Sequence, residues 1–507
     1  MNKRIVFVFV LLAFLSACGG EVNNETQTPG TAAPLPVVTD APPTKSPDPA
    51  PTSPPTPTPQ LVEVRILSEG TGMEEPGPWL IFADAAGFWL ISQNGDEIGF
   101  MPVSWEYMTT QWEVSSRGGL LAMVQGEQIS AKFMKVLSLP TYTFPLTVDL
   151  LGFEGDELSF DSEQDTRDFI EDRYFAVGQP VWSSDGSKLA FVSSHLGPSP
   201  DVYVYDIPSN EVARLTSGPA HAVDLYWSPD DKYIYHAGAE KLWMGYSGSG
   251  YSGWTFYAAK ADGSGVTTVY KSEVDQGHEN IVGWYSDNEV LMDSGYWFCG
   301  KFDLRIVDIE SGTRVSIWPD QYDQIAYNPV GKTALVWVSP EAFSGEDCGP
   351  TEESGLFLVS IPDGQREKLT GFDDNYLVLD MEWNEKVSRF ILDLYTIWGM
   401  VRTAGDVEIL DEKPVFSPDG VMTALLGYKG KSLHVLDQAG NTIEIETAGT
   451  VMHPTWSLDG TRLFFFAETE TTGKYYLYLA QAPDFMPVLI SEELFDRRIG
   501  AAEWVMP

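Results

Sequence analysis

A short pattern, an aromatic residue followed by Ser-x-Asp-Gly or a close variant, recurs along the chain and constrains its fold strongly. It occurs at residues 182–186 (Trp-Ser-Ser-Asp-Gly), 227–231 (Trp-Ser-Pro-Asp-Asp), 416–420 (Phe-Ser-Pro-Asp-Gly) and 456–460 (Trp-Ser-Leu-Asp-Gly). Aspartate bonds back to the turn backbone and glycine accepts a positive φ, so each copy predicts a tight turn between two strands. The recurrence of this pattern along the chain indicates a repeat architecture built from strands.

Short β-rich runs follow these cassettes, for example at residues 202–207, 304–309 and 433–437. Each run ends in a polar turn and precedes another short strand, as at residues 211–215. Four short antiparallel strands per repeat are the blade of a β-propeller. The sequence therefore predicts an all-β fold, a single β-propeller that spans residues 61–507.

Weaker cassettes fill the gaps between the four clear ones, and each has an aromatic anchor. The anchors are Trp112, Trp182, Trp227, Trp284, Tyr327, Trp383, Phe416, Trp456 and Trp504, nine in all. Propellers usually have four to eight blades, so this count favours about eight blades and allows nine.

The last anchor, Trp504, has no strand-forming sequence after it. The strands expected at residues 79–82 and 88–91 have no anchor before them. We therefore expect the C-terminal strand to pair with these N-terminal strands and to close the ring, because closure removes the exposed strand edges.

The cassette and the Val-Tyr-Val-Tyr-Asp strand at residues 202–206 resemble the TolB-type, WD-repeat-like β-propeller repeat. The same repeat occurs in the propeller domains of prolyl oligopeptidase and dipeptidyl peptidases. The resemblance covers most of residues 79–507 and implies a periplasmic scaffold that binds envelope proteins. This chain departs from TolB in its N-terminal region, where no α/β domain is expected. Since such propellers host many functions, the resemblance is specific for the fold rather than for an activity.

Residues 1–18 have the features of a bacterial lipoprotein signal peptide. Lys3 and Arg4 precede an apolar run at residues 5–15, which is too short for a typical membrane span. Leu-Ser-Ala-Cys then resembles a lipobox, so Cys18 is expected to carry the lipid. The alternative is a free cysteine at the end of an ordinary signal.

Residues 19–60 are expected to form a disordered stalk. Twelve prolines lie between Pro29 and Pro59, and such a composition favours a semi-rigid, extended spacer. Together with the lipid signal, the stalk predicts an exported protein anchored to the outer face of the cytoplasmic membrane, or to the outer membrane if the cell has two.

The charge of the chain narrows the classes of partner. The chain has 31 Lys and Arg residues against 73 Asp and Glu residues, a formal charge of −42, which disfavours binding to nucleic acid.

Cys299 and Cys348 fall between the second and third strands of consecutive repeats. In an exported protein we expect them to form a disulfide, with two separate thiols as the alternative.

The sequence offers no catalytic constellation. The Gly-rich segment at residues 245–250 lacks the second glycine of a Gly-x-Ser-x-Gly elbow. The six histidines are scattered without the spacing of metal ligands. The acidic run at residues 154–168 lacks the spacing of a calcium loop and is interpreted as a solvated insertion. We therefore expect a non-enzymatic protein without catalytic residues, metal or cofactor.

Long loops rich in aromatic residues emerge from three successive repeats, and they should lie over one sector of one face of the ring. The candidate ligand-binding residues in these loops are Trp243, Tyr246, Tyr251, Trp254, Tyr296, Trp297, Phe298, Phe343, Asp347, Asp373 and Asp374. Aromatic rings with polar groups suit a binding surface, and carboxylates accept hydrogen bonds from sugar hydroxyls. The alternative is that these rings only pack the loops against one another.

Three functions are compatible with these features. The first is a non-enzymatic surface lipoprotein whose propeller binds a protein or glycan partner in the cell envelope. The second is a hydrolase of glycans or peptides that uses paired carboxylates among Asp347, Glu352, Asp373 and Asp374. The third is a structural envelope scaffold without a dedicated site.

Overall fold

A computed structural model describes most of residues 60–507. The residues left out are 1–59, 62–64, 69–70, 85, 103–110, 129–130, 153–175, 198, 246–247, 273–277, 297–299, 341–352, 371, 373–375, 395–396, 402–406, 438, 448, 470, 472 and 497–501. The expected signal peptide, lipidation site, acidic insertion and disulfide therefore lie outside the described residues. Among the helices that are described, none is long and apolar enough to cross a membrane.

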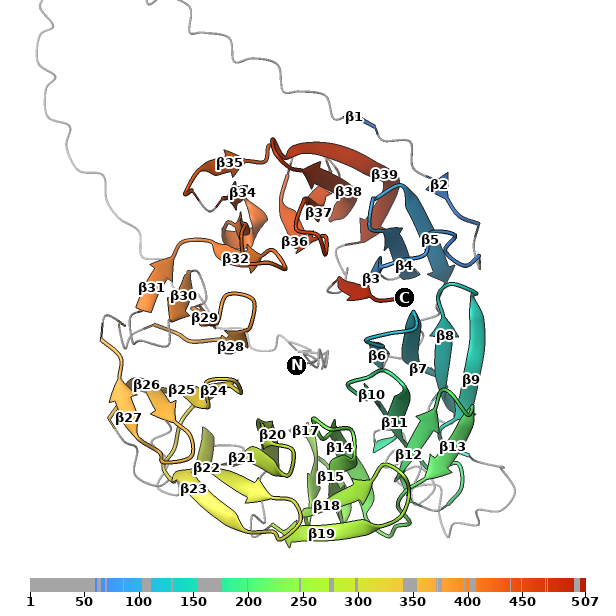
Figure 1. Ribbon diagram of the computed structural model, residues 1–507, viewed down its shortest axis with the longest axis vertical. Coiled ribbons are helices and arrows are strands. Elements are labelled where there is room, and N and C mark those ends of the chain that lie inside the picture. The colour runs from blue at the N-terminus through green and yellow to red at the C-terminus, as the bar shows by residue number, and fades with distance from the viewer. Residues whose placement is uncertain are drawn as a thin grey trace, which may run out of the picture. The chain divides into compact units, whose positions relative to one another are not determined.

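The described strands form nine blades around a ring, which we number in chain order (Figure 1). From the inside outward, blade 1 contains β40 (Glu503–Val505), β3 (Trp79–Ala83), β4 (Gly87–Ser92) and β5 (Glu97–Pro102). Blade 2 contains β6 (Gln111–Val114), β7 (Leu120–Gln128), β8 (Ala131–Ser138) and β9 (Thr143–Asp149). Blade 3 contains β10 (Gly178–Trp182), β11 (Lys188–Ser193), β12 (Asp201–Asp206) and β13 (Glu211–Arg214).

The next three blades include an inserted hairpin, which lies in blade 4. Blade 4 contains β14 (His221–Trp227), β15 (Tyr233–Ala239), β18 (Thr255–Lys260) and β19 (Val266–Lys271), with β16 (Lys241–Gly245) and β17 (Gly248–Ser252) inserted. Blade 5 contains β20 (His278–Ser286), β21 (Glu289–Tyr296), β22 (Gly300–Asp308) and β23 (Arg314–Trp318). Blade 6 contains β24 (Gln324–Asn328), β25 (Thr333–Val338), β26 (Gly355–Ser360) and β27 (Arg366–Lys368).

The last three blades complete the ring. Blade 7 contains β28 (Asp380–Asn384), β29 (Arg389–Asp393), β30 (Trp398–Val401) and β31 (Val407–Leu410). Blade 8 contains β32 (Lys413–Phe416), β33 (Thr423–Leu426), β34 (Leu433–Leu436) and β35 (Thr442–Glu444), with the 3₁₀ turn η1 (Tyr428–Gly430) between β33 and β34. Blade 9 contains β36 (Val451–Trp456), β37 (Arg462–Glu468), β38 (Lys474–Gln481) and β39 (Met486–Asp496).

The all-β propeller expected from the sequence is confirmed, and its described blades number nine. The nine aromatic anchors therefore gave the right number of blades, whereas the usual size range of propellers had favoured about eight. Each anchor lies in the innermost strand of its own blade, from Trp112 in β6 to Trp504 in β40.

The ring closes as the sequence predicted. The C-terminal strand β40 pairs antiparallel with β3, which places Leu80 opposite Trp504 and Ile81 opposite Glu503. Beyond β40, the carbonyl of Met506 accepts a hydrogen bond of 2.8 Å from the backbone N–H of Gly119 in blade 2. We call the junction between blade 9 and blade 1 the seam.

The turn after each clear anchor has the structure that its residues predict. The cassette serine donates its hydroxyl to the cassette aspartate at 2.6–2.8 Å in all four clear copies. In the second copy Asp231 stands where the others have glycine and adopts a φ of 56°. Its carboxylate accepts hydrogen bonds from Ser184 in the preceding turn, 2.8 Å from the backbone N–H. This departure from the cassette therefore links two neighbouring blades.

Four of the anchor tryptophans also link neighbouring blades through their indole N–H groups. Each of these four donates to a backbone carbonyl in the innermost strand of the preceding blade: Trp182 to Glu113 at 3.1 Å, Trp227 to Val181 at 2.9 Å, Trp456 to Val415 at 2.8 Å and Trp504 to Trp456 at 2.8 Å. A hydrophobic ring and a polar N–H on one side chain explain why tryptophan recurs at this position.

We predict that Trp456→Phe lowers the free energy of unfolding by about 1–2 kcal/mol more than Trp318→Phe does. Both tryptophans are buried, and both substitutions remove the same atoms from a packed core. The Trp318 indole N–H has no acceptor among the described residues, whereas that of Trp456 has one. Urea denaturation of the two variants measures the difference, and equal losses would show that the hydrogen bond between blades contributes nothing.

Candidate functional site

Insertions in blades 4 and 5 emerge on the face where the second strand joins the third and where one blade joins the next. The hairpin β16–β17 is inserted between β15 and β18. Strands β20, β21 and β22 have nine, eight and nine residues, whereas β24, β25 and β26 of blade 6 have five, six and six. An isolated bridge between Lys301 and Tyr322 joins the start of β22 to the connection toward blade 6. We call this sector of blades 4 to 6 the loop edge.

The structure places only some of the candidate ligand-binding residues. The backbone register puts Trp243 opposite Gly250 and Tyr251 opposite Leu242 in the inserted hairpin, and Tyr296 is the last residue of β21. The candidates that lie outside the described residues are Tyr246, Trp297, Phe298, Phe343, Asp347, Asp373 and Asp374, together with Glu352.

Trp254 is the one candidate whose side chain is described, and it lies in the core. It is 5% exposed and belongs to the cluster that includes Tyr235, Phe256 and Val307. Its ring therefore packs the base of the insertion, the alternative that the sequence had left open for these aromatic residues. We do not include it in the binding surface.

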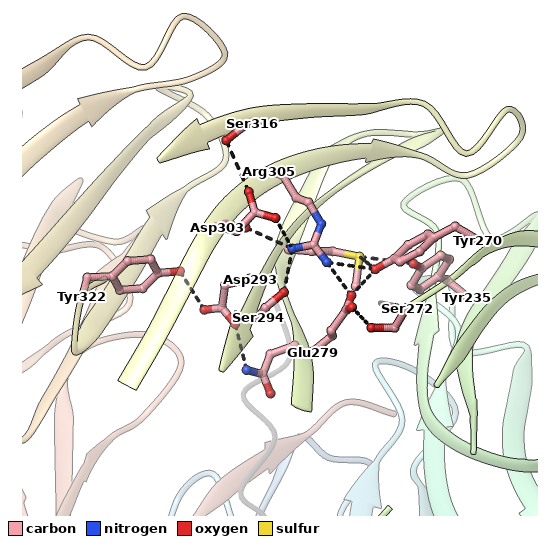
Figure 2. Close-up of polar contacts among 12 residues, drawn as sticks. Tyr235, Tyr270, Ser272, Glu279, Asp293, Ser294, Asp303, Arg305, Ser316 and Tyr322 are labelled. Carbon is pink, nitrogen blue, oxygen red and sulfur yellow. Dashed lines mark hydrogen bonds and ion pairs between the residues drawn. The ribbon is translucent and has the colours of Figure 1, made fainter. Parts of the chain in front are cut away.

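A buried ion pair lies beneath the loop edge (Figure 2). Arg305 in β22 and Glu279 in β20 are 4% and 5% exposed, and their side chains form a hydrogen-bonded ion pair. Glu279 also accepts hydrogen bonds from Tyr270 in β19 of blade 4 and from Ser272 just beyond it. The pair therefore joins the outermost strand of blade 4 to two strands of blade 5.

The other side of the Arg305 guanidinium contacts blade 5 itself. Its Nη1 donates to Ser294 Oγ at 2.8 Å and to the Asp303 carboxylate at 3.0 Å. A guanidinium presents its donors in a fixed planar arrangement, so several partners at once fix its orientation. Arg305 thereby connects β21 and β22 where the register of their pairing shifts, between Met292 and Ser294.

A second buried carboxylate joins blade 5 to blade 6. Asp293 in β21 is fully buried and accepts hydrogen bonds from Tyr322 Oη at 2.9 Å and Asn280 Nδ2 at 2.8 Å. Burial raises the pKa of Tyr322 well above its ordinary value, and the Asp293 carboxylate raises it further. Tyr322 therefore stays a protonated donor to Asp293 at neutral pH.

These polar residues position the loop edge rather than provide an exposed reactive group. The carboxylates of Glu279 and Asp293 are buried and accept hydrogen bonds from neighbouring residues, whereas the Asp303 side chain is 38% exposed and pairs with Arg305. Across the described part of the chain, no group of three or more His, Cys, Asp or Glu side chains is arranged to hold a metal ion.

Sequence reasoning missed this network, although its signal was present. Asp293 follows Val-Leu-Met in β21, and Arg305 lies between Leu304 and Ile306 in β22. A charged residue within an apolar strand is rarely buried without a partner. Which strand would supply that partner was not evident from the sequence.

Comparison with solved structures identifies the architecture. A crystal structure of the eukaryotic initiation factor is similar to this chain, with a TM-score of 0.51 at 13% identity, over 84% of this chain and 98% of that chain. At this identity the likeness concerns the fold alone. The chain is a β-propeller.

Two enzyme structures resemble this propeller less closely. An oligogalacturonate lyase in complex with manganese has a TM-score of 0.37 at 15% identity, over 74% of this chain and 96% of the lyase. Dipeptidyl peptidase 4 of Porphyromonas gingivalis has a TM-score of 0.43 at 10% identity, over 80% of this chain and 56% of the peptidase. No sequence family and no curated protein matches the chain.

We predict that Arg305→Met lowers the free energy of unfolding by about 3–5 kcal/mol, because it leaves the Glu279 carboxylate buried without its cation. The double variant Arg305→Met/Glu279→Leu should recover much of this loss, since no buried charge then lacks a partner. Urea denaturation of both variants provides the measurement.

The exposed pair of Lys271 and Glu240, whose side chains are 63% and 57% exposed, provides the control. Lys271→Met should change stability little, because water screens an exposed ion pair. A double variant as unstable as Arg305→Met alone would contradict the role given to this buried pair.

Proposed function

We propose that this protein is a lipid-anchored β-propeller of the cell envelope that binds a protein or a glycan without catalysing a reaction. The binding surface is the loop edge of blades 4 to 6. The TolB-type character of the repeat and the position outside the cytoplasmic membrane are parts of the same proposal.

The observation that carries the proposal is the buried polar network beneath the insertions. Arg305, Glu279 and Asp293 join strands of blades 4 and 5 to the connection that leads into blade 6. A surface whose base is already ordered loses less conformational entropy on binding, so more of the contact energy appears as affinity. Such a base suits insertions that recognise a partner.

The composition of the inserted hairpin favours recognition. Residues 241–252 contain Trp243, Tyr246 and Tyr251 together with glycine and serine. Binding loops commonly combine large aromatic rings, which give contact area at low entropic cost, with small polar residues that adapt their hydrogen bonds. The same rings stack on sugars, so both a protein and a glycan are compatible partners.

The expected cellular location of the protein and its net charge support a partner in the cell envelope. Residues 15–18 resemble a lipobox, and the proline-rich segment that follows would hold the propeller away from the membrane surface. A formal charge of −42 favours neutral or basic partners over nucleic acid.

A pair of double variants of the full-length lipoprotein tests the proposal. Trp243→Ala/Trp297→Ala removes two aromatic candidates from the loop edge. Phe144→Ala/Tyr428→Ala removes two aromatic rings from blades 2 and 8 that are 44% and 42% exposed. We expect the first double variant to lower affinity for isolated cell-wall glycan, or cross-linking to envelope proteins, at least tenfold, and the second to leave both unchanged.

Equal behaviour of the two double variants would place the binding surface elsewhere. Turnover of glycan or peptide substrates that is lost in Asp347→Asn or Asp373→Asn would instead show that the protein is an enzyme. In both cases circular dichroism should show that the variants keep their strand content.

A further inference from the structure

Residues 60–61 and residues 65–66 each add a fifth strand to one blade of the ring. Strand β1 (Gln60–Leu61) pairs parallel with β39, with Gln60 opposite Val488. Strand β2 (Arg65–Ile66) pairs parallel with β5, with Arg65 opposite Glu97. Both strands lie on the outer perimeter, and among the described sheets only these two have five strands (Figure 1).

The two blades that carry an added strand are the two that meet at the seam. Strand β39 is the outermost strand of blade 9, and β5 is that of blade 1, whose innermost strand is the C-terminal β40. The step from Leu61 to Arg65 covers at most about 14 Å in an extended chain. Strands β1 and β2, which are close in sequence, therefore lie on the two sides of the seam at its outer rim.

The seam between these blades is packed with aromatic side chains. The ring centroids of Phe82 in blade 1 and Phe466 in blade 9 are 4.8 Å apart, and those of Trp89 and Phe495 are 5.0 Å apart. This packing lies between the inner closure by β40 and the added outer strands. An opening of the seam would expose these aromatic rings to water, which is unfavourable.

Strand β2 and Leu67 are attached to blade 1 through backbone hydrogen bonds and packing. The backbone N–H groups of Arg65 and Leu67 donate to the carbonyls of Asp96 and Ile98, each at 2.8 Å. The Arg65 guanidinium makes a bidentate contact with Glu74, at 2.5 and 2.6 Å. Leu67 is 6% exposed and packs in the core of blades 1 and 2.

We propose that strands β1 and β2, together with Leu67, are an outer clasp that holds the seam closed together with β40. The inner closure rests on a three-residue strand and the outer one on two strands of two residues each. Each pairing is short, but they hold opposite rims of the same junction. The seam opens fully only when both are released. This inference concerns ring closure and does not depend on the proposed binding function.

Two variants of the full-length chain separate the clasp from its side-chain contacts. Arg65→Pro removes the N–H that donates to Asp96 together with the guanidinium, whereas Arg65→Ala removes the guanidinium and keeps the N–H. Hydrogen exchange followed by mass spectrometry reports the opening of β40 and of the Gly119 amide, which donates to Met506.

We expect Arg65→Pro to accelerate exchange in β40 and at Gly119 at least tenfold, and Arg65→Ala to change it less than threefold. Exchange in β18 of blade 4, far from the seam in sequence, should be unchanged in both. The proposal is overturned if the Leu67 amide of Arg65→Pro exchanges freely while β40 stays as protected as in the original chain.

A cross-linked variant covers the case in which Arg65→Pro does not fold or keeps the Leu67 amide protected. Leu61→Cys/Leu489→Cys, with the native cysteines replaced by serine, is joined by a short bis-maleimide across the paired positions. Linked protein should exchange β40 at least threefold more slowly than the same variant left unlinked. Identical exchange in the two forms would also overturn the proposal.

Discussion

The pairing of β40 with β3 is the constraint on which the rest of this molecule depends. A row of blades joined only along the chain would leave one blade incomplete and two aromatic faces exposed to water. The three residues Glu503–Val505 complete blade 1 and bring it against blade 9. Phe82 and Phe466 then pack against each other across the seam. The free energy of closure therefore comes chiefly from the apolar surface that this short strand allows the two blades to bury.

A repeated contact also stabilises several of the other joints between blades. A tryptophan in the innermost strand fills the space between two blades and donates its N–H to a carbonyl of the preceding one, as Trp182 and Trp456 do. Blades 4 and 5 add a different joint, in which Arg305 and Glu279 meet away from water. Burying an ion pair gains little stability over apolar packing, but losing one partner is costly, so such a pair specifies one arrangement. That specificity matters where the insertions of the loop edge need a fixed base.

Much of the fold was predictable from the sequence, and much less of the candidate site. The turn at residues 182–186 predicted strands and blades, because the chemistry of a turn is local and the same turn repeats along the chain. The anchor Trp504 predicted the closure of the ring. The number of blades followed from the number of aromatic anchors. Only the usual size of propellers had favoured a lower number. Trp254 was assigned to the surface because composition does not distinguish a ring on a loop from a ring packed beneath it. The partners of Arg305 come from β19, β20 and β21, and contacts between distant strands have no local signal.

The central claim, that the C-terminal strand closes the ring in the stated register, has a direct test. Cysteines are introduced at Ile81 and Glu503, which face each other in β3 and β40, in a chain whose native cysteines are serine. Mild oxidation of the folded protein should give a single intramolecular disulfide between residues 81 and 503, identified by peptide mass spectrometry. Paired positions on adjacent strands bring the two Cβ atoms close enough for such a bond. Two free thiols, or disulfides only between molecules, would contradict closure by β40.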